Sequence, residues 1–144
     1  MSSVRFLRGS ALTRFEKPRG LSIARGMAGL LHDVGKTSIP DTILLKPGKL
    51  DEAEWTMVRN HPQRGHDILS ASEGISDIAL EVCLRHHEKM DGTGYPGNIA
   101  ADNLSLITRM SSICDVYDAI TSQRSYNTPL SASQALARMQ TWSG

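Results

Sequence analysis

Histidine and aspartate residues interrupt several otherwise apolar segments of this sequence. Some follow directly on an apolar run, and others stand where a helical pattern ends. An unpaired carboxylate or imidazole is costly to bury, so burial of such groups requires a cation or hydrogen-bond partners. Six of them are candidates for one site: His32, Asp33, His61, His86, His87 and Asp115.

Four imidazoles and two carboxylates make a nitrogen and oxygen ligand set. Such a set suits iron, manganese, nickel or zinc, and the lack of a cysteine motif excludes a structural zinc ribbon. Two ions about 3.5–4 Å apart bind a phosphate and supply a hydroxide for in-line attack. The residue types therefore favour hydrolysis of a phosphoester. Taken singly, each residue has a plainer interpretation, as a hydrogen-bonded core histidine, a helix cap or a solvated surface carboxylate.

Helices separated by loops must position these residues. From about Leu21 the apolar spacing predicts a helix that Gly35 ends. Residues 38–50 include two prolines and predict a loop with little regular structure. The sequence "DEAE" is a capping-box pattern that opens the next helix. That helix must end near His61, because Pro62 disfavours helical geometry in the residue before it and can itself begin another helix.

The helical pattern over residues 75–86 places His86 on its buried side. His87 is adjacent, and neighbouring helical side chains diverge by about 100°. The two histidines are therefore better placed to contact two neighbouring ions than to coordinate a single ion together.

The rest of the pattern is also helical. A glycine-rich loop precedes a long helix over about 104–121, in which Met110 and Cys114 are expected on the inner side. The sequence "SASQ" is a second capping-box pattern and opens a C-terminal helix. No segment shows the alternation of a strand. The fold class predicted is all-α, a compact domain of about six helices with one long glycine-rich loop.

Composition sets the limits of this interpretation. The chain has 144 residues, of which 40% are hydrophobic, which is enough for one domain. Its net charge of +1 argues against binding of a nucleic acid polymer, and no run is long and apolar enough to predict a membrane segment. Cys83 and Cys114 are interpreted as buried thiols in a reducing compartment, which predicts a cytoplasmic location. Residues 1–20 are basic and irregular, and predict a tail before a domain over 21–144.

Four stretches, "HDVGK", "HPQRG", "RHHEKMDGTGYPG" and "CDVYDAITSQRSY", occur in an order that resembles the HD-GYP domain, a branch of the HD metal-dependent phosphohydrolases. The resemblance covers the chain from about Leu21 to its end. It implies a helical fold and hydrolysis of cyclic di-GMP to pGpG or GMP. It also implies two or three metal ions, iron or manganese first, with zinc or nickel as alternatives.

The resemblance also implies roles for individual residues. The six candidate residues would be the metal ligands, with Asp33 bridging two ions that hold the attacking hydroxide. Lys36 and Arg124 would contact substrate phosphate. Tyr95 and Pro96 would form a lip of the substrate site and a surface for GGDEF-type or other signalling domains.

One departure from the family pattern leaves two functions open. Family members carry an upstream helix that supplies another histidine, whereas this chain has no histidine before His32. We therefore expect the domain to be truncated at both ends. A metal-dependent phosphodiesterase is the first hypothesis. The alternative is a catalytically impaired module that acts by nucleotide binding or protein interaction.

Overall fold

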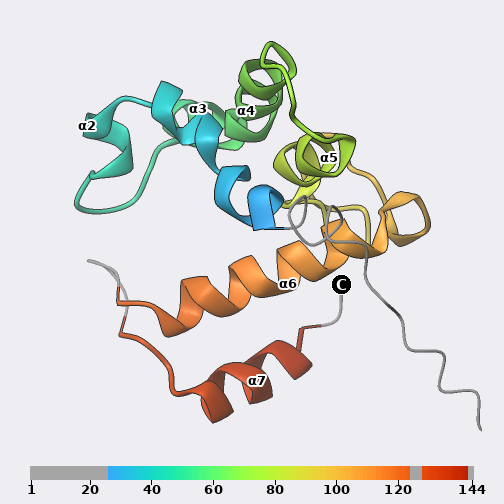
Figure 1. Ribbon diagram of the computed structural model, residues 1–144. Helices are drawn as coiled ribbons and strands as arrows, with labels where there is room; N and C mark the ends of the chain where they lie inside the picture. Colours follow the sequence, from blue (N-terminus) through green and yellow to red (C-terminus); the bar gives the residue numbers. More distant parts are fainter. Residues whose placement is uncertain (1–25, 124–127, 143–144) are drawn as a thin grey trace, which may run out of the picture.

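The computed structural model describes residues 26–123 and 128–142 (Figure 1). These residues form helices joined by loops and include no strand, so the prediction of an all-α fold is confirmed. After a helix over residues 26–31, the elements in chain order are as follows: η1 (Val34–Ser38), α2 (Asp41–Leu44), α3 (Glu52–Arg59), α4 (His61–Ser70), α5 (Asp77–Arg85), η2 (Ala101–Asn103), α6 (Leu106–Thr121) and α7 (Ala132–Gln140). None of the helices in the described ranges has the length and apolar character needed to cross a membrane.

Packing between neighbouring helices brings the segments together. α4 packs against η1 and α5, α5 packs against α6, and α7 covers another side of α6 (Figure 1). The core between them is small. Ala28, Ala79 and Val82 are buried in one cluster, and Ile78 and Ile107 pack against it. The inward side predicted for residues 75–86 is therefore confirmed.

Local sequence signals fix several helix ends as predicted. Asp51 and Glu54 form a reciprocal capping box at the start of α3, and Ser131 and Gln134 form another at α7. α3 ends at Arg59 and α4 begins with Pro62 in its first turn. The prediction that residues 38–50 form an irregular loop is wrong in one detail, because this segment contains the short helix α2.

Gly35 does not end a helix, contrary to the prediction. The first helix stops at residue 31, and Gly35 lies inside the 3-10 helix η1, where it is buried. A Cβ atom at this position would lie 1.9 Å from the carbonyl oxygen of His61 and 2.6 Å from the backbone nitrogen of Gly65. The glycine is needed because the backbones of η1 and α4 approach each other there.

The inner side predicted for α6 is wrong at two positions. Met110 and Cys114 are exposed, whereas Thr108 is fully buried. Glu81 of α5 explains the difference, because it accepts a hydrogen bond of 3.1 Å from the Thr108 hydroxyl. This contact lets a polar residue take the inner position. Cys83 is buried as predicted, and both cysteines are free thiols.

Candidate metal centre

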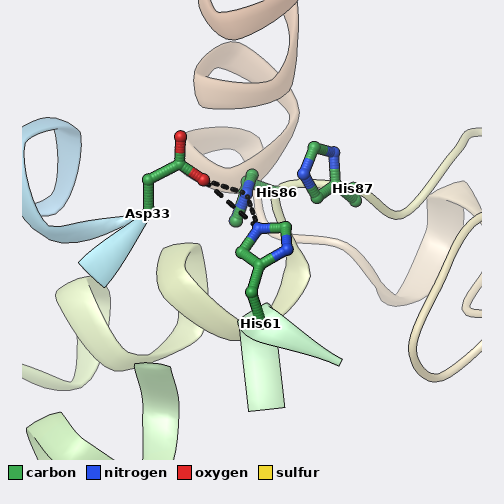
Figure 2. Close-up of side chains that lie close together, drawn as sticks. All are labelled: Asp33, His61, His86 and His87. Carbon is green, nitrogen blue, oxygen red and sulfur yellow. Dashed lines mark hydrogen bonds and ion pairs between the residues drawn. The ribbon is translucent and has the colours of Figure 1, made fainter. Parts of the chain in front are cut away.

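Four helix ends and faces bring the six predicted residues to one region of the fold. His32 and Asp33 lie between the first helix and η1, and His61 begins α4. His86 and His87 directly follow α5, and Asp115 lies on α6. Asp33, His61, His86 and His87 each offer one ligand atom, and these atoms lie within 4.8 Å of one another. Figure 2 shows the four side chains pointing toward a common centre. We call these four residues the His/Asp cluster.

The Asp33 carboxylate lies at the centre of these contacts. Its Oδ1 is 3.2 Å from His61 Nε2 and 3.6 Å from His86 Nε2 (Figure 2). Its Oδ2 is 3.4 Å from His32 Nε2 and accepts a hydrogen bond of 2.5 Å from the Lys36 ammonium. Burial alone would raise the pKa of Asp33, but hydrogen bonds from His61 and His86, in rings that carry a proton on Nε2, and from the Lys36 ammonium hold that pKa well below the usual range. Asp33 is therefore an anion with its two oxygens facing different groups.

Backbone carbonyls fix which nitrogen of three histidines carries the proton. Nδ1 of His32 contacts the carbonyl of Gly29 at 2.8 Å, and Nδ1 of His61 contacts that of Val58 at 2.6 Å. Nδ1 of His86 likewise contacts carbonyls of α5, at 3.0 and 3.1 Å. A carbonyl only accepts, so Nδ1 donates in each case and the neutral ring presents Nε2 as a lone pair.

When the rings are neutral, the groups around Asp33 Oδ1 are all acceptors. The Nε2 atoms of His61 and His86 are 3.4 Å apart, and in neutral rings neither carries a proton. His32 Nε2 and Asp33 Oδ1 are buried without a hydrogen-bond partner. Neutral imidazole lone pairs around a carboxylate fit a divalent cation, and Nδ1–H bonds to carbonyls are the usual support of metal-binding histidines. The His/Asp cluster could thus hold a metal ion.

His86 and His87 do not diverge as helical geometry predicted. α5 ends at Arg85, so both histidines lie beyond its last turn, and their ring centroids are 4.1 Å apart. The His87 ring also stacks on Tyr95, with centroids 4.8 Å apart and 28° between the planes. Burial, together with the nearby His86 and His61, lowers the pKa of His87 to about 3. The His87 ring is therefore neutral near pH 7 and can offer a lone pair.

His32 and Asp115 flank the His/Asp cluster. Asp115 Oδ1 lies 3.7 Å from His32 Nε2, on the side of Asp33 Oδ2. This contact raises the pKa of His32 and lowers the pKa of Asp115. Asp33 thus faces His61 and His86 with one oxygen and His32 with the other, an arrangement that suits a carboxylate shared by two ions.

The predicted substrate contacts have different placements. The Lys36 ammonium is paired with Asp33, and its side chain is 38% exposed. Tyr95 is half-buried and Pro96 is exposed. Burial raises the pKa of Tyr95 to about 12, which keeps its phenol neutral. Arg124 lies outside the described residues.

A buried glutamate, Glu88, holds the loop that carries Tyr95 and Pro96. We call residues 86–100 the GYP loop. Glu88 is only 4% exposed, and its carboxyl group accepts hydrogen bonds from the backbone N–H groups of Gly97 (2.5 Å) and Ile99 (3.0 Å). The sequence did not reveal this role. The signal for it was an acidic residue directly after the two histidines. Asp91, the other acidic residue of the loop, bonds its near neighbour Thr93.

The glycines of the GYP loop are required for different reasons. Of Gly92, Gly94 and Gly97, only Gly92 has a positive φ, at 75°. Gly94 is required for another reason. A Cβ there would lie 2.4 Å from the Cα of Glu88 and 2.4 Å from the nitrogen of Lys89, so the loop folds back directly onto the chain after α5.

Replacing Glu88 by glutamine should release this loop. A glutamine keeps the volume but has one oxygen, so one of the two N–H groups loses its acceptor and the buried side chain directs an N–H₂ donor toward it, at a cost of about 2 kcal/mol in the free energy of unfolding. We expect this loss in urea denaturation, with faster hydrogen exchange at the amides of Gly97 and Ile99. The control is Glu73→Gln at an exposed position. Unchanged exchange at both amides would contradict the bracing role.

The fold and the site define a class of protein: a helical domain in which histidine and aspartate side chains form one cluster. Residues 8–144 match the sequence profile described as "HD domain". A cyclic di-GMP phosphodiesterase of Pseudomonas aeruginosa is 50% identical over 135 residues, 93% of this chain and 33% of that relative. The cyclic di-GMP phosphodiesterase response regulator RpfG of Xanthomonas campestris is 42% identical over 112 residues, 77% of this chain and 30% of the relative.

A third relative, the 3'3'-cGAMP-specific phosphodiesterase 2 of Vibrio cholerae, is 46% identical over 103 residues, 71% of this chain and 20% of the relative. The chain therefore spans a third or less of the length of these three relatives. The chain belongs to the HD domain family, in its HD-GYP branch.

Proposed function

We propose that this chain is a metal-dependent phosphodiesterase domain that hydrolyses cyclic di-GMP to pGpG or GMP. The observation that carries the proposal is the acceptor-only centre. In it, Nε2 lone pairs fixed by backbone carbonyls surround the Asp33 carboxylate. The relatives named as cyclic di-GMP phosphodiesterases support the choice of substrate.

The ligands proposed are the six residues of the sequence analysis. The His/Asp cluster would hold one ion, and His32 and Asp115 would hold another with Asp33 shared between them. A divalent ion bound here supplies Lewis-acid activation of the phosphodiester and lowers the pKa of a water molecule. We propose two or three ions, with iron or manganese preferred over zinc or nickel.

The protein's own groups would orient the substrate. Lys36 would exchange its contact with Asp33 for one with a phosphate oxygen once metal charge compensates the carboxylate, and Arg124 would contact phosphate as well. Tyr95 and Pro96 would form the lip of the site. The proposal extends to a cytoplasmic location and to contact with GGDEF-type or other signalling domains through the GYP loop.

Turnover by the purified chain tests this function. The chain is loaded with manganese or ferrous iron and incubated with cyclic di-GMP, and the products are separated by chromatography. We expect pGpG or GMP from the natural chain and none from the His32→Ala/Asp33→Ala variant. A folded, metal-loaded chain without turnover would overturn the enzyme proposal. It would favour the second candidate, a catalytically impaired module that acts by nucleotide binding or protein interaction.

A further inference from the structure

An open groove of about 580 Å³ lies beside the His/Asp cluster. It forms where the end of α3, the start of α4 and the GYP loop meet. Its lining includes Met57, Arg59, Asn60, Arg64, Tyr95 and Pro96. The volume is in the range of pockets for small ligands. The lining combines cationic side chains with apolar and aromatic surface, and no step proposed above uses Arg59 or Arg64.

Two aromatic rings hold the Arg59 guanidinium in place. Its Cζ atom is 5.7 Å from the centroid of the Trp55 ring and 5.9 Å from that of Tyr95. Such cation–π contacts restrict the guanidinium but leave its N–H groups available. Within the described part of the chain neither Arg59 nor Arg64 has an ion-pair partner, so both charges remain open to a ligand.

Tyr95 connects this groove to the His/Asp cluster. Its ring contacts the Arg59 guanidinium and also stacks on His87. A nucleotide whose phosphate lies at the cluster would therefore extend its base past Tyr95 toward Arg59. The apolar surface of Met57, Tyr95 and Pro96 suits a flat base better than a second phosphate.

We propose that this groove binds a guanine base of the substrate and that Arg59 is its specificity-determining residue. The proposal rests on the proposed function. A guanidinium forms two parallel hydrogen bonds with the O6 and N7 acceptors of guanine. Adenine has an N–H₂ donor in place of O6, so it can accept only one of these two hydrogen bonds, at N7. Cyclic di-GMP and 3'3'-cGAMP, which appear in the names of the relatives, both contain guanine.

Calorimetric titration of the full, manganese-loaded chain tests the proposal without needing turnover. The ligands are 5'-GMP, 5'-AMP and ribose 5-phosphate, which lacks a base. We expect 5'-GMP to bind about tenfold more tightly than 5'-AMP, the discrimination typical of one bidentate contact. Arg59→Ala should remove this preference, and Arg59→Lys should weaken it, because a lysine ammonium lacks the planar pair of donors. Affinity for ribose 5-phosphate should not change.

The matched control is Arg138→Ala. Arg138 makes a similar contact with Trp142 at 5.8 Å, on α7 and away from the groove, so this variant should keep the preference for 5'-GMP. Equal affinity of the natural chain for 5'-GMP and 5'-AMP would overturn the proposal. If Arg59→Ala lowered the affinity for ribose 5-phosphate as much as the affinity for 5'-GMP, the proposal would also be overturned, because Arg59 would then contact phosphate. A guanine preference in a chain that does not hydrolyse cyclic di-GMP would refute only the proposed activity.

Discussion

Asp33→Asn is expected to remove most of the bound metal and nearly all turnover of cyclic di-GMP. The Asp33 carboxylate is the anion that the Nε2 atoms of His61 and His86 face, at 3.2 and 3.6 Å. An asparagine has nearly the same shape, but it is neutral and directs an N–H₂ donor into a centre built from acceptors. We expect metal affinity to fall by about 100-fold or more and turnover by about 1,000-fold or more.

Two measurements separate these effects. Elemental analysis of the purified protein gives the metal content, and product chromatography gives the rate. Asp67→Asn is the matched control, because Asp67 lies on α4 with its side chain 65% exposed and outside the His/Asp cluster. If Asp33→Asn retained both metal and turnover, Asp33 would not be a ligand. Retained metal with lost turnover would instead limit its role to the reaction.

Periodicity and one proline predicted the placement of two residues of the His/Asp cluster. His86 continues the buried side of α5, and it is buried in the structure. Pro62 forces a helix boundary, which places His61 at the first turn of α4. Both predictions rest on short-range geometry, which a sequence pattern records directly.

Contacts between elements were not predictable in the same way. The rotation of α6 depends on Glu81 of α5, which satisfies the hydroxyl of Thr108 and lets that residue take an inner position. The convergence of His86 and His87 depends on α5 ending at Arg85, and helix ends are poorly fixed by pattern alone. The ion pair of Lys36 with Asp33 depends on three-dimensional proximity to a buried anion.

The groove lined by Arg59 could not be predicted from the sequence for the same reason. In the sequence, Arg59 is an ordinary charged residue in the last turn of α3, where a cation favours the helix dipole. Only the return of the GYP loop past α3 brings Tyr95 against its guanidinium. That return depends in turn on Glu88 and Gly94, which hold the loop against the chain after α5.

Gly35→Ala should be the most destabilising of these substitutions for the fold. The added Cβ would lie 1.9 Å from the His61 carbonyl oxygen and 2.6 Å from the Gly65 nitrogen. Both are backbone atoms, so no side chain can rotate away and η1 must separate from α4. We expect a loss of about 3 kcal/mol or more in the free energy of unfolding, the upper part of the range for overpacking. That is a large share of the 5–15 kcal/mol typical of a domain.

Urea denaturation of the metal-free protein measures this loss, with Gly29→Ala as the control. Gly29 lies in the first helix, and a Cβ there would meet no atom within 4 Å. Alanine at Gly29 should therefore leave stability unchanged or raise it by up to about 1 kcal/mol. Equal stability of the two variants would mean that η1 and α4 are not in close contact. Because the same contact holds Asp33 beside His61, a destabilised Gly35→Ala protein should also bind less metal, which links the fold to the metal centre.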